Sequence, residues 1–301
     1  MSNIKETVSN KLNIRFASIE EGQQLIQRNT QYYHRLTQMD LDWRCMKEGA
    51  TLDELIPFAQ SNVLDFTARD KDIIMQTVEF IEYRLDEFEC RLPLPGEVIF
   101  IKTNMEDESN AAAYTSGNMI FLKYSCLERR SSFLRELITH ELFHIITRHS
   151  PEFRQKMYSL IGFTVMDHDI EFPERIKRRI MANPDVEHID NYAEFTIDGV
   201  KRKCALVAYF AKSWAEASKL EGPLATFFNN YHTVLLPLDE LDHPYKISAA
   251  SDFWEKLGRN TTYVSAPEEC LAVNFSYAIV YGPDQNYRSP QLIRSILSAL
   301  K

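Results

Sequence analysis

The sequence lacks the features that mark several large classes of protein. No uncharged apolar stretch reaches the roughly 18 to 20 residues of a membrane-spanning helix, and the opening "MSNIKETVSNKLNIRF" has no apolar core like that of a secretory signal. No Lys/Arg cluster is larger than "RIKRR" at 175–179, and the formal net charge is −9. We therefore expect a cytoplasmic protein with neither a nucleic-acid partner nor a membrane partner.

Cysteine is also scarce. The five cysteines lie far apart and form no C-x-x-C pair, which argues against a disulfide framework and against a thiolate zinc site. Repeats, low-complexity tracts and linkers rich in proline or glycine are absent as well. The sequence thus predicts one domain over 1–301, and nothing in it indicates an oligomeric state.

Periodicity divides this domain into two regions. Residues 1–92 are predicted to form a helical layer, because apolar residues recur at spacings of three and four in 19–37, 51–60 and 68–89. After "LPLPGE" the period becomes that of strands, at 97–103 and at 111–124, where "SGN" marks a turn.

The region 93–301 is predicted to be the core of the domain. A hairpin insertion is expected near 190–210, with Asp198-Gly199 at its turn, and Ser150-Pro151 predicts a helix start. Further helices are expected at 248–258, 267–281 and 289–300. Together these patterns indicate an α+β fold with a small mixed sheet packed on a buried helix and a helical C-terminal region.

That buried helix carries the chemistry of the sequence. In "FLRELITHELFHII", His140 and His144 are four positions apart, so both project from one face and can share a metal ion. Glu141 lies beside them, where a carboxylate can take a proton from water at an open coordination position. The spacing suits Zn²⁺, although histidines with satisfied partners in an ordinary core would give the same pattern without a metal.

The H-E-x-x-H stretch resembles the zincin metallopeptidases. "APEECLAVNFSYAI" at 266–279 is similar to the glutamate helix, "P-E-E-x-L-A-x-N-F", of gluzincin-like bacterial proteins, a branch that includes the thermolysin type. The resemblance implies a zincin-like fold and a hydrolase in which Glu269 is the third zinc ligand. Val273 replaces an Asp that often orients the first histidine, and Asn274 is the expected substitute.

Several alternatives stay open at this point. The other candidates for the third ligand are Glu268, Asp167, His168, His188, His232 and His243. Cys270 is expected to pack in the core, with a redox-sensitive neighbour of the metal as its alternative role. An oxyanion donor is expected among Tyr192, Tyr209, Tyr263 and Tyr277.

The resemblance also implies a substrate-binding edge strand. Ala112, Ala113 and Tyr114 are expected to pair with the backbone of a peptide or protein substrate, the alternative being a plain edge strand. The leading hypothesis is a zinc-dependent peptidase with Glu141 as its base. The rival is a binding or regulatory protein that keeps this scaffold without turnover, with the fourth metal position blocked by Cys270 or a histidine.

Overall fold

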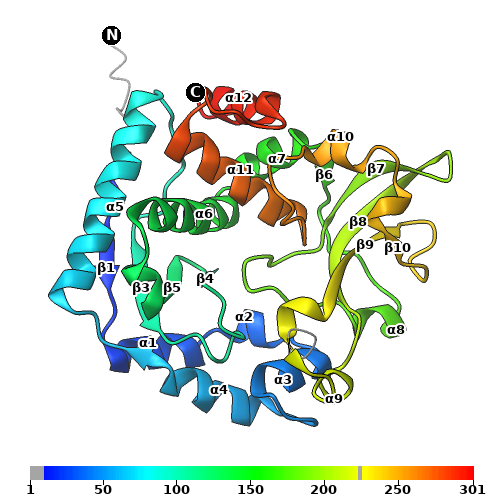
Figure 1. The fold of residues 1–301 in the computed structure, drawn as a ribbon, viewed down its shortest axis with the longest axis horizontal. Coiled ribbons are helices and arrows are strands. Elements are labelled where there is room, and N and C mark those ends of the chain that lie inside the picture. The colour runs from blue at the N-terminus through cyan, green and yellow to red at the C-terminus, as the bar shows by residue number, and fades with distance from the viewer. Residues whose placement is uncertain (1–9, 223–225) are drawn as a thin grey trace.

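Two β-sheets and a central helix organise the chain (Figure 1). The computed structural model describes residues 10–222 and 226–301. Most of the opening segment that was tested for a secretory signal lies outside these residues. No helix in the described part of the chain is both long and apolar enough to cross a membrane. The α+β class predicted from the sequence is confirmed.

The first sheet is small and mixed, as expected. Its strands follow the order β1 (Ile14–Phe16), β3 (Val98–Thr103), β5 (Met119–Lys123) and β4 (Ala113–Ser116). Strands β1 and β5 run parallel to β3, whereas β4 is antiparallel to β5. A fifth short strand, β2 (Val63–Leu64), pairs antiparallel with the end of β3. Within the described residues β4 is an edge strand, because β5 is its sole neighbour.

The predicted helical layer over 1–92 is more broken than its periodicity suggested. The segment 19–37 forms two helices, because the backbone of Asn29 leaves the helical region and its side chain accepts a hydrogen bond from Ser116 Oγ, 2.8 Å away. The layer also contributes β1 and β2 to the first sheet. Its helices are α1 (Ile19–Gln27), α2 (Thr30–Tyr33), α3 (Gln38–Cys45), α4 (Leu52–Ser61) and α5 (Ala68–Glu87).

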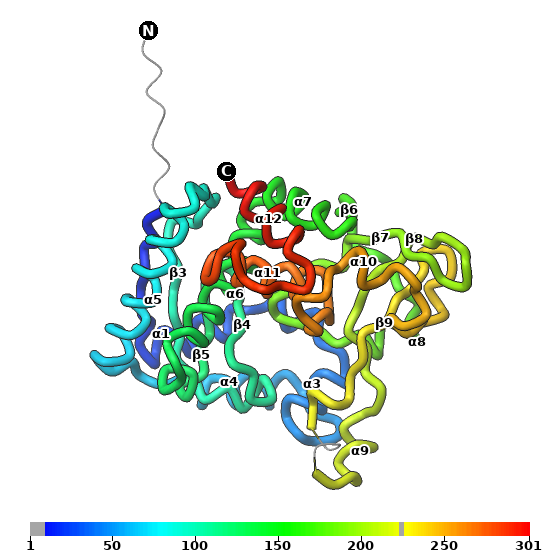
Figure 2. Tube along the Cα trace, turned by 45° about the horizontal axis from the view of Figure 1, so that its top comes forward, coloured from blue at the N-terminus to red at the C-terminus, as the bar shows by residue number. Residues whose placement is uncertain are grey.

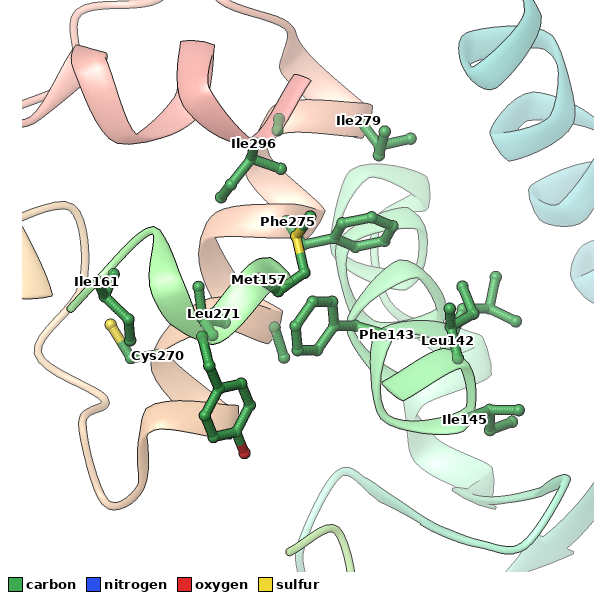
Figure 3. Packing of buried hydrophobic residues seen from close by; sticks show 14 of the residues in the cluster. Leu142, Phe143, Ile145, Met157, Ile161, Cys270, Leu271, Phe275, Ile279 and Ile296 are labelled. Atoms are coloured by element: carbon green, nitrogen blue, oxygen red, sulfur yellow. The ribbon is translucent and has the colours of Figure 1, made fainter. Parts of the chain in front are cut away.

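The central helix, α6 (Ser131–His149), lies between the first sheet and the C-terminal helix α11 (Pro267–Tyr281). A helix that is apolar all round must be covered on every side. Here β4, α5, α7 (Pro151–Ser159) and α11 contact α6. Figure 3 shows Phe143 of α6 facing Phe275 of α11, with their ring centroids 5.2 Å apart. This packing fixes α11 against the face of α6 that carries the histidines.

The second sheet was only partly foreseen. It is antiparallel throughout, in the order β10 (Tyr245–Lys246), β9 (Tyr231–Pro237), β8 (Val200–Phe210), β7 (Asn191–Ile197) and β6 (Phe163–Val165). Asp198 and Gly199 form the hairpin turn between β7 and β8, both with positive φ, as Asp-Gly predicts. The expected insertion near 190–210 is thus the middle of a five-stranded sheet.

The remaining helices are short or C-terminal. Ser150 accepts a hydrogen bond from Phe153 N at 3.3 Å and so caps α7, as its Ser-Pro start predicted. Figure 2 shows α12 lying along α11 near the C-terminus. The helices are α8 (Glu174–Lys177), α9 (Trp214–Ala217), α10 (Phe253–Leu257) and α12 (Pro290–Ala299).

Candidate metal centre

His140 and His144 project from consecutive turns of α6 toward one point. Their Nε2 atoms are 3.0 Å apart, and the ring planes make an angle of 80°. The His144 side chain is completely buried, whereas 15% of the His140 side chain is exposed. The pair thus faces a small space that opens to solvent on the His140 side.

Glu269, in the first turn of α11, completes a triangle with the two histidines. Its Oε2 lies 3.1 Å from His140 Nε2 and 3.6 Å from His144 Nε2. Tetrahedral ligands at 2.0 to 2.1 Å from zinc are about 3.3 Å apart, so one ion can reach all three atoms without rearrangement. The structure therefore brings together the three predicted ligands as a group that could hold a metal ion.

Strong electrostatic coupling accompanies this triangle. Burial would raise the pKa of the Glu269 carboxyl, but its contacts with the two imidazoles hold the pKa well below its usual range. Burial would likewise lower the pKa of His144, yet the charge of Asp185, a hydrogen bond to Glu268, and the hydrogen bond and charge of Glu269 raise it. Three carboxylates around one imidazole form a site that favours a cation.

Glu268 orients His144 from the opposite side of the ring. Its Oε1 lies 3.2 Å from His144 Nδ1, and Tyr158 donates to its Oε2 at 2.7 Å. Thr147 also donates to Oε1. A carboxylate on the second imidazole nitrogen fixes the tautomer and leaves Nε2 as the ligand atom. Glu268 therefore has a supporting position, and Glu269 has the one that faces both histidines.

The expectation that Asn274 orients a histidine is wrong. Its Nδ2 donates to the carbonyl of Cys270 at 2.7 Å, and its Oδ1 accepts from Asn260 Nδ2 at 2.9 Å. Cys270 Sγ lies 3.5 Å from the Leu257 carbonyl, and the side chain packs among apolar residues (Figure 3). The core role expected for Cys270 agrees with this position.

Glu141 lies beside the triangle with an unused acceptor. The residue is 2% exposed, and among the described residues its Oε2 has no hydrogen-bond partner. Burial, together with the nearby charges of Asp185 and Glu269, raises the pKa of Glu141 well above its usual value. A buried carboxylate oxygen of this kind is suited to exchange a proton with a small polar molecule in the site.

Two site residues were missed from the sequence. Asn183 donates to Oε1 of Glu269, and Asp185 accepts from the backbone N–H and the hydroxyl of Thr115 at 2.6 and 2.7 Å. Oxygens of Asp185 and Glu141 and a ring nitrogen of His144 lie within 4.8 Å of one another. The sequence "ANPD" at 182–185 indicates only a turn. No local pattern could therefore have placed Asn183 or Asp185 at the site.

The other candidates for the third ligand lie elsewhere. His168 pairs with Asp167 at 2.6 Å, and His188 pairs with Asp169 at 3.1 Å, in both cases on the surface. His243 stacks near Tyr245, and His232 is an exposed residue of β9. Within the described residues, none of these belongs to a group whose atoms could share an ion.

The tyrosine candidates separate clearly. The ring of Tyr263 is 6.5 Å from that of His140. Tyr192, Tyr209 and Tyr277 lie next to Lys203, Arg179 and Tyr287, respectively. Tyr231 was not among the candidates, yet burial and the charge of Glu269 raise its pKa to about 12. Tyr263 is therefore the candidate that the fold places beside the histidines.

The expected substrate strand is the edge strand β4, but only some of its residues have backbone groups that face outward. The Tyr114 ring is buried and stacks on Phe121 at 4.4 Å, while the carbonyl of Ala112 accepts from Lys123 N at 3.0 Å. Thr115 N–H points away from β5 toward Asp185, so the antiparallel register places the backbone groups of Ala113 on the same outer edge. Ala113 and Thr115 are thus the residues whose backbone faces outward.

A polar cavity of about 280 Å³ lies behind His144. Glu268 and Tyr158 line one side, and residues 185–188 line another. Arg154 and Asp190 also line it, and the Arg154 guanidinium donates to both carboxylate oxygens of Asp190, at 2.7 and 2.6 Å. The segment that contains Asp185 therefore lies between this cavity and Glu141.

Comparison with known protein families matches part of this chain. Residues 101–152 are similar to the eCIS core domain family, a stretch that runs from β3 through β4, β5 and α6. It includes the two histidines and Glu141 but ends before α11. Searches of curated proteins and of solved structures gave no significant match. The shared region is thus the edge-strand hairpin and the histidine helix.

Proposed function

We propose that this protein is a zinc-dependent hydrolase, and specifically a peptidase of gluzincin type. The observation that carries the proposal is the triangle of His140 Nε2, His144 Nε2 and Glu269 Oε2, with the unpartnered Oε2 of Glu141 beside it. Three protein ligands and a neighbouring buried carboxylate make up the donor set of a catalytic zinc site. When bound, zinc supplies the Lewis acidity that polarises a carbonyl and acidifies water.

The chain's own groups divide the remaining work. Glu141 accepts a proton from the attacking water at Oε2, which has no hydrogen-bond partner among the described residues, and returns the proton to the leaving amine. Glu268, held by Tyr158 and Thr147, keeps His144 in one tautomer. The outward backbone groups of Ala113 on β4 are available to pair with a peptide backbone.

A second candidate is a binding or regulatory protein with a closed metal site. The observation that favours it is Asp185, whose carboxylate lies beside both His144 and Glu141. As a permanent fourth ligand, it would leave no room for water. Four protein ligands on the ion mark a structural site, and an open position marks a catalytic one.

Metal analysis of purified protein, combined with hydrolysis of fluorescein-labelled casein, tests the proposal. We expect one zinc per chain, lost in His140→Ala and retained in Glu141→Gln, with hydrolysis abolished in both. His243→Ala, which alters an exposed histidine outside the site, is the matched control. Wild-type protein without zinc, or equal hydrolysis by Glu141→Gln and wild type, would refute the proposal.

A further inference from the structure

Residues 183–187 occupy a position that an incoming substrate would need. Asp185 accepts both the backbone N–H and the hydroxyl of Thr115, and that N–H belongs to the outer edge of β4. An extended peptide joining this edge would have to bond the same group. The segment and a substrate therefore compete for Thr115.

The same segment also covers the reacting groups. Asp185 lies beside Glu141 and His144, so its carboxylate fills space in which water and a carbonyl would have to meet. On its other side the segment borders the 280 Å³ cavity. Displacing it would join this cavity to the metal centre and create a groove along β4.

Contacts from the N-terminal layer hold the segment in place. Arg44 of α3 donates to the Ala182 carbonyl at 2.8 Å, and Asp40 accepts from Ala182 N at 3.1 Å. Arg35 donates to the carbonyls of Asn183 and Val186. At the other end, Glu187 pairs with Arg148 of α6. The segment is thus clamped between the N-terminal helices and α6 at both of its ends.

We propose that residues 183–187 are an internal plug that fills the substrate groove and holds hydrolysis at a low level until it is displaced. The proposal rests on the proposed function, because it assumes a metal at the triangle. It assigns the groove to an extended peptide that bonds the outer edge of β4 at Ala113 and Thr115, with one side chain entering the cavity behind His144. Asp185 is the residue that such a peptide must replace.

The test uses acetohydroxamic acid, a small zinc-binding probe, on the full-length zinc-loaded protein. Because Asp185 must move before the probe can bind, Asp185→Ala should bind it about tenfold or more tightly than wild type, as removal of a closed state requires. Asp167→Ala removes an exposed aspartate outside the site and should match wild type. Calorimetry gives the affinities, and casein hydrolysis should rise in parallel in Asp185→Ala.

A measurement on wild type covers the case in which Asp185→Ala fails to fold. Hydrogen exchange of peptides spanning 113–116 and 182–188 should be slow in zinc-loaded protein and should accelerate in 182–188 when the probe saturates the site. Equal probe affinity in both folded proteins, or unchanged exchange with the probe bound, would overturn the plug. Absence of zinc from wild type would instead overturn the proposed function.

Discussion

Glu268 is the residue whose role depends most on a single pair of contacts. It lies between His144 Nδ1 and two hydroxyl donors, Tyr158 and Thr147. Loss of such a supporting carboxylate typically weakens metal binding by about 10- to 100-fold. If Glu268 were itself a ligand, its removal would cost far more and would change the coordination sphere.

We therefore predict that Glu268→Gln retains one zinc but binds it about 10- to 100-fold more weakly than wild type. Competition with a chromophoric chelator measures the affinity, and Glu255→Gln on the exposed face of α10 is the control. A cobalt-substituted protein whose visible spectrum is unchanged by the mutation would agree with the supporting role. Complete loss of the metal would contradict it.

Asp190 gives a prediction in terms of pH. Burial alone would raise the pKa of its carboxyl, but hydrogen bonds and charge from Arg154 lower the pKa below the usual value. A lowered folded-state pKa stabilises the protein above the unfolded value of about 3.9, and this stabilisation disappears as the pH falls through the folded value. The Arg154–Asp190 ion pair should thus stabilise the folded protein at neutral pH but not in acid.

Asp190→Asn should lower the free energy of unfolding at pH 7 by about 2 kcal/mol, in the range for hydrogen bonds to charged groups. The difference from wild type should shrink as the pH falls from 5 to 3. Urea unfolding at several pH values measures it. The control Asp242→Asn, which breaks an exposed pair with Arg175, should lower the free energy of unfolding by less than about 1 kcal/mol. A loss of stability in Asp190→Asn that does not depend on pH would argue against the ion pair.

At the scale of elements, helix α7 depends on its N-terminal cap. Ser150 accepts from Phe153 N, while Pro151 occupies the first helical position. Ser150→Ala should lower the free energy of unfolding by about 1 kcal/mol, because the first turn loses an acceptor. Urea denaturation followed by circular dichroism measures the loss. Ser159→Ala, at the exposed end of the same helix, should cause no loss, and an equal loss in both variants would exclude the cap as the cause.

Elements that depend on local contacts could be predicted from the sequence, whereas elements that depend on contacts distant along the chain could not. Helices α6, α7 and α11 and the turn at Asp198-Gly199 carry their signals within a few residues. The break at Asn29 depends on its contact with Ser116, far along the chain. Strand β9 pairs with β8 across a long connection, so its place in a second sheet could not be read from its own residues.

The site shows the same contrast. The spacing of His140, Glu141 and His144 is a local property of one helix, and the resemblance singled out Glu269 on another. Adjacent glutamates on α11 point in different directions, and only the packing of α11 on α6 separates the role of Glu268 from that of Glu269. Asp185 reaches the site from a loop, so its part in the site follows from tertiary structure alone.

At the scale of the whole molecule, Arg44 joins three parts of the chain. It is 2% exposed, pairs with Asp40 at 3.0 Å and Glu108 at 3.1 Å, and donates to the carbonyl of Ala182. Burial raises the pKa of the Glu108 carboxyl to about 7 even with Arg44 beside it. Removing the guanidinium would leave two acidic groups without their common cation.

Arg44→Met should therefore lower the free energy of unfolding by about 3 to 5 kcal/mol, the cost of breaking a buried pair by removing one partner. Urea unfolding gives the value. Arg178→Met, at an exposed arginine, should stay within about 0.5 kcal/mol of wild type. A loss below 1 kcal/mol in Arg44→Met would show that the network is not coupled to stability.

The histidines lie on α6 and the carboxylate that faces them lies on α11, and His140 and Glu269 are 129 positions apart along the chain. A bound ion would thus cross-link two helices that are far apart along the backbone. The ion could dissociate only when α6 and α11 separate, so its transfer to a chelator would report how often the two helices separate while the rest of the protein stays folded. The rate of metal dissociation would therefore measure the rate of local opening in the core.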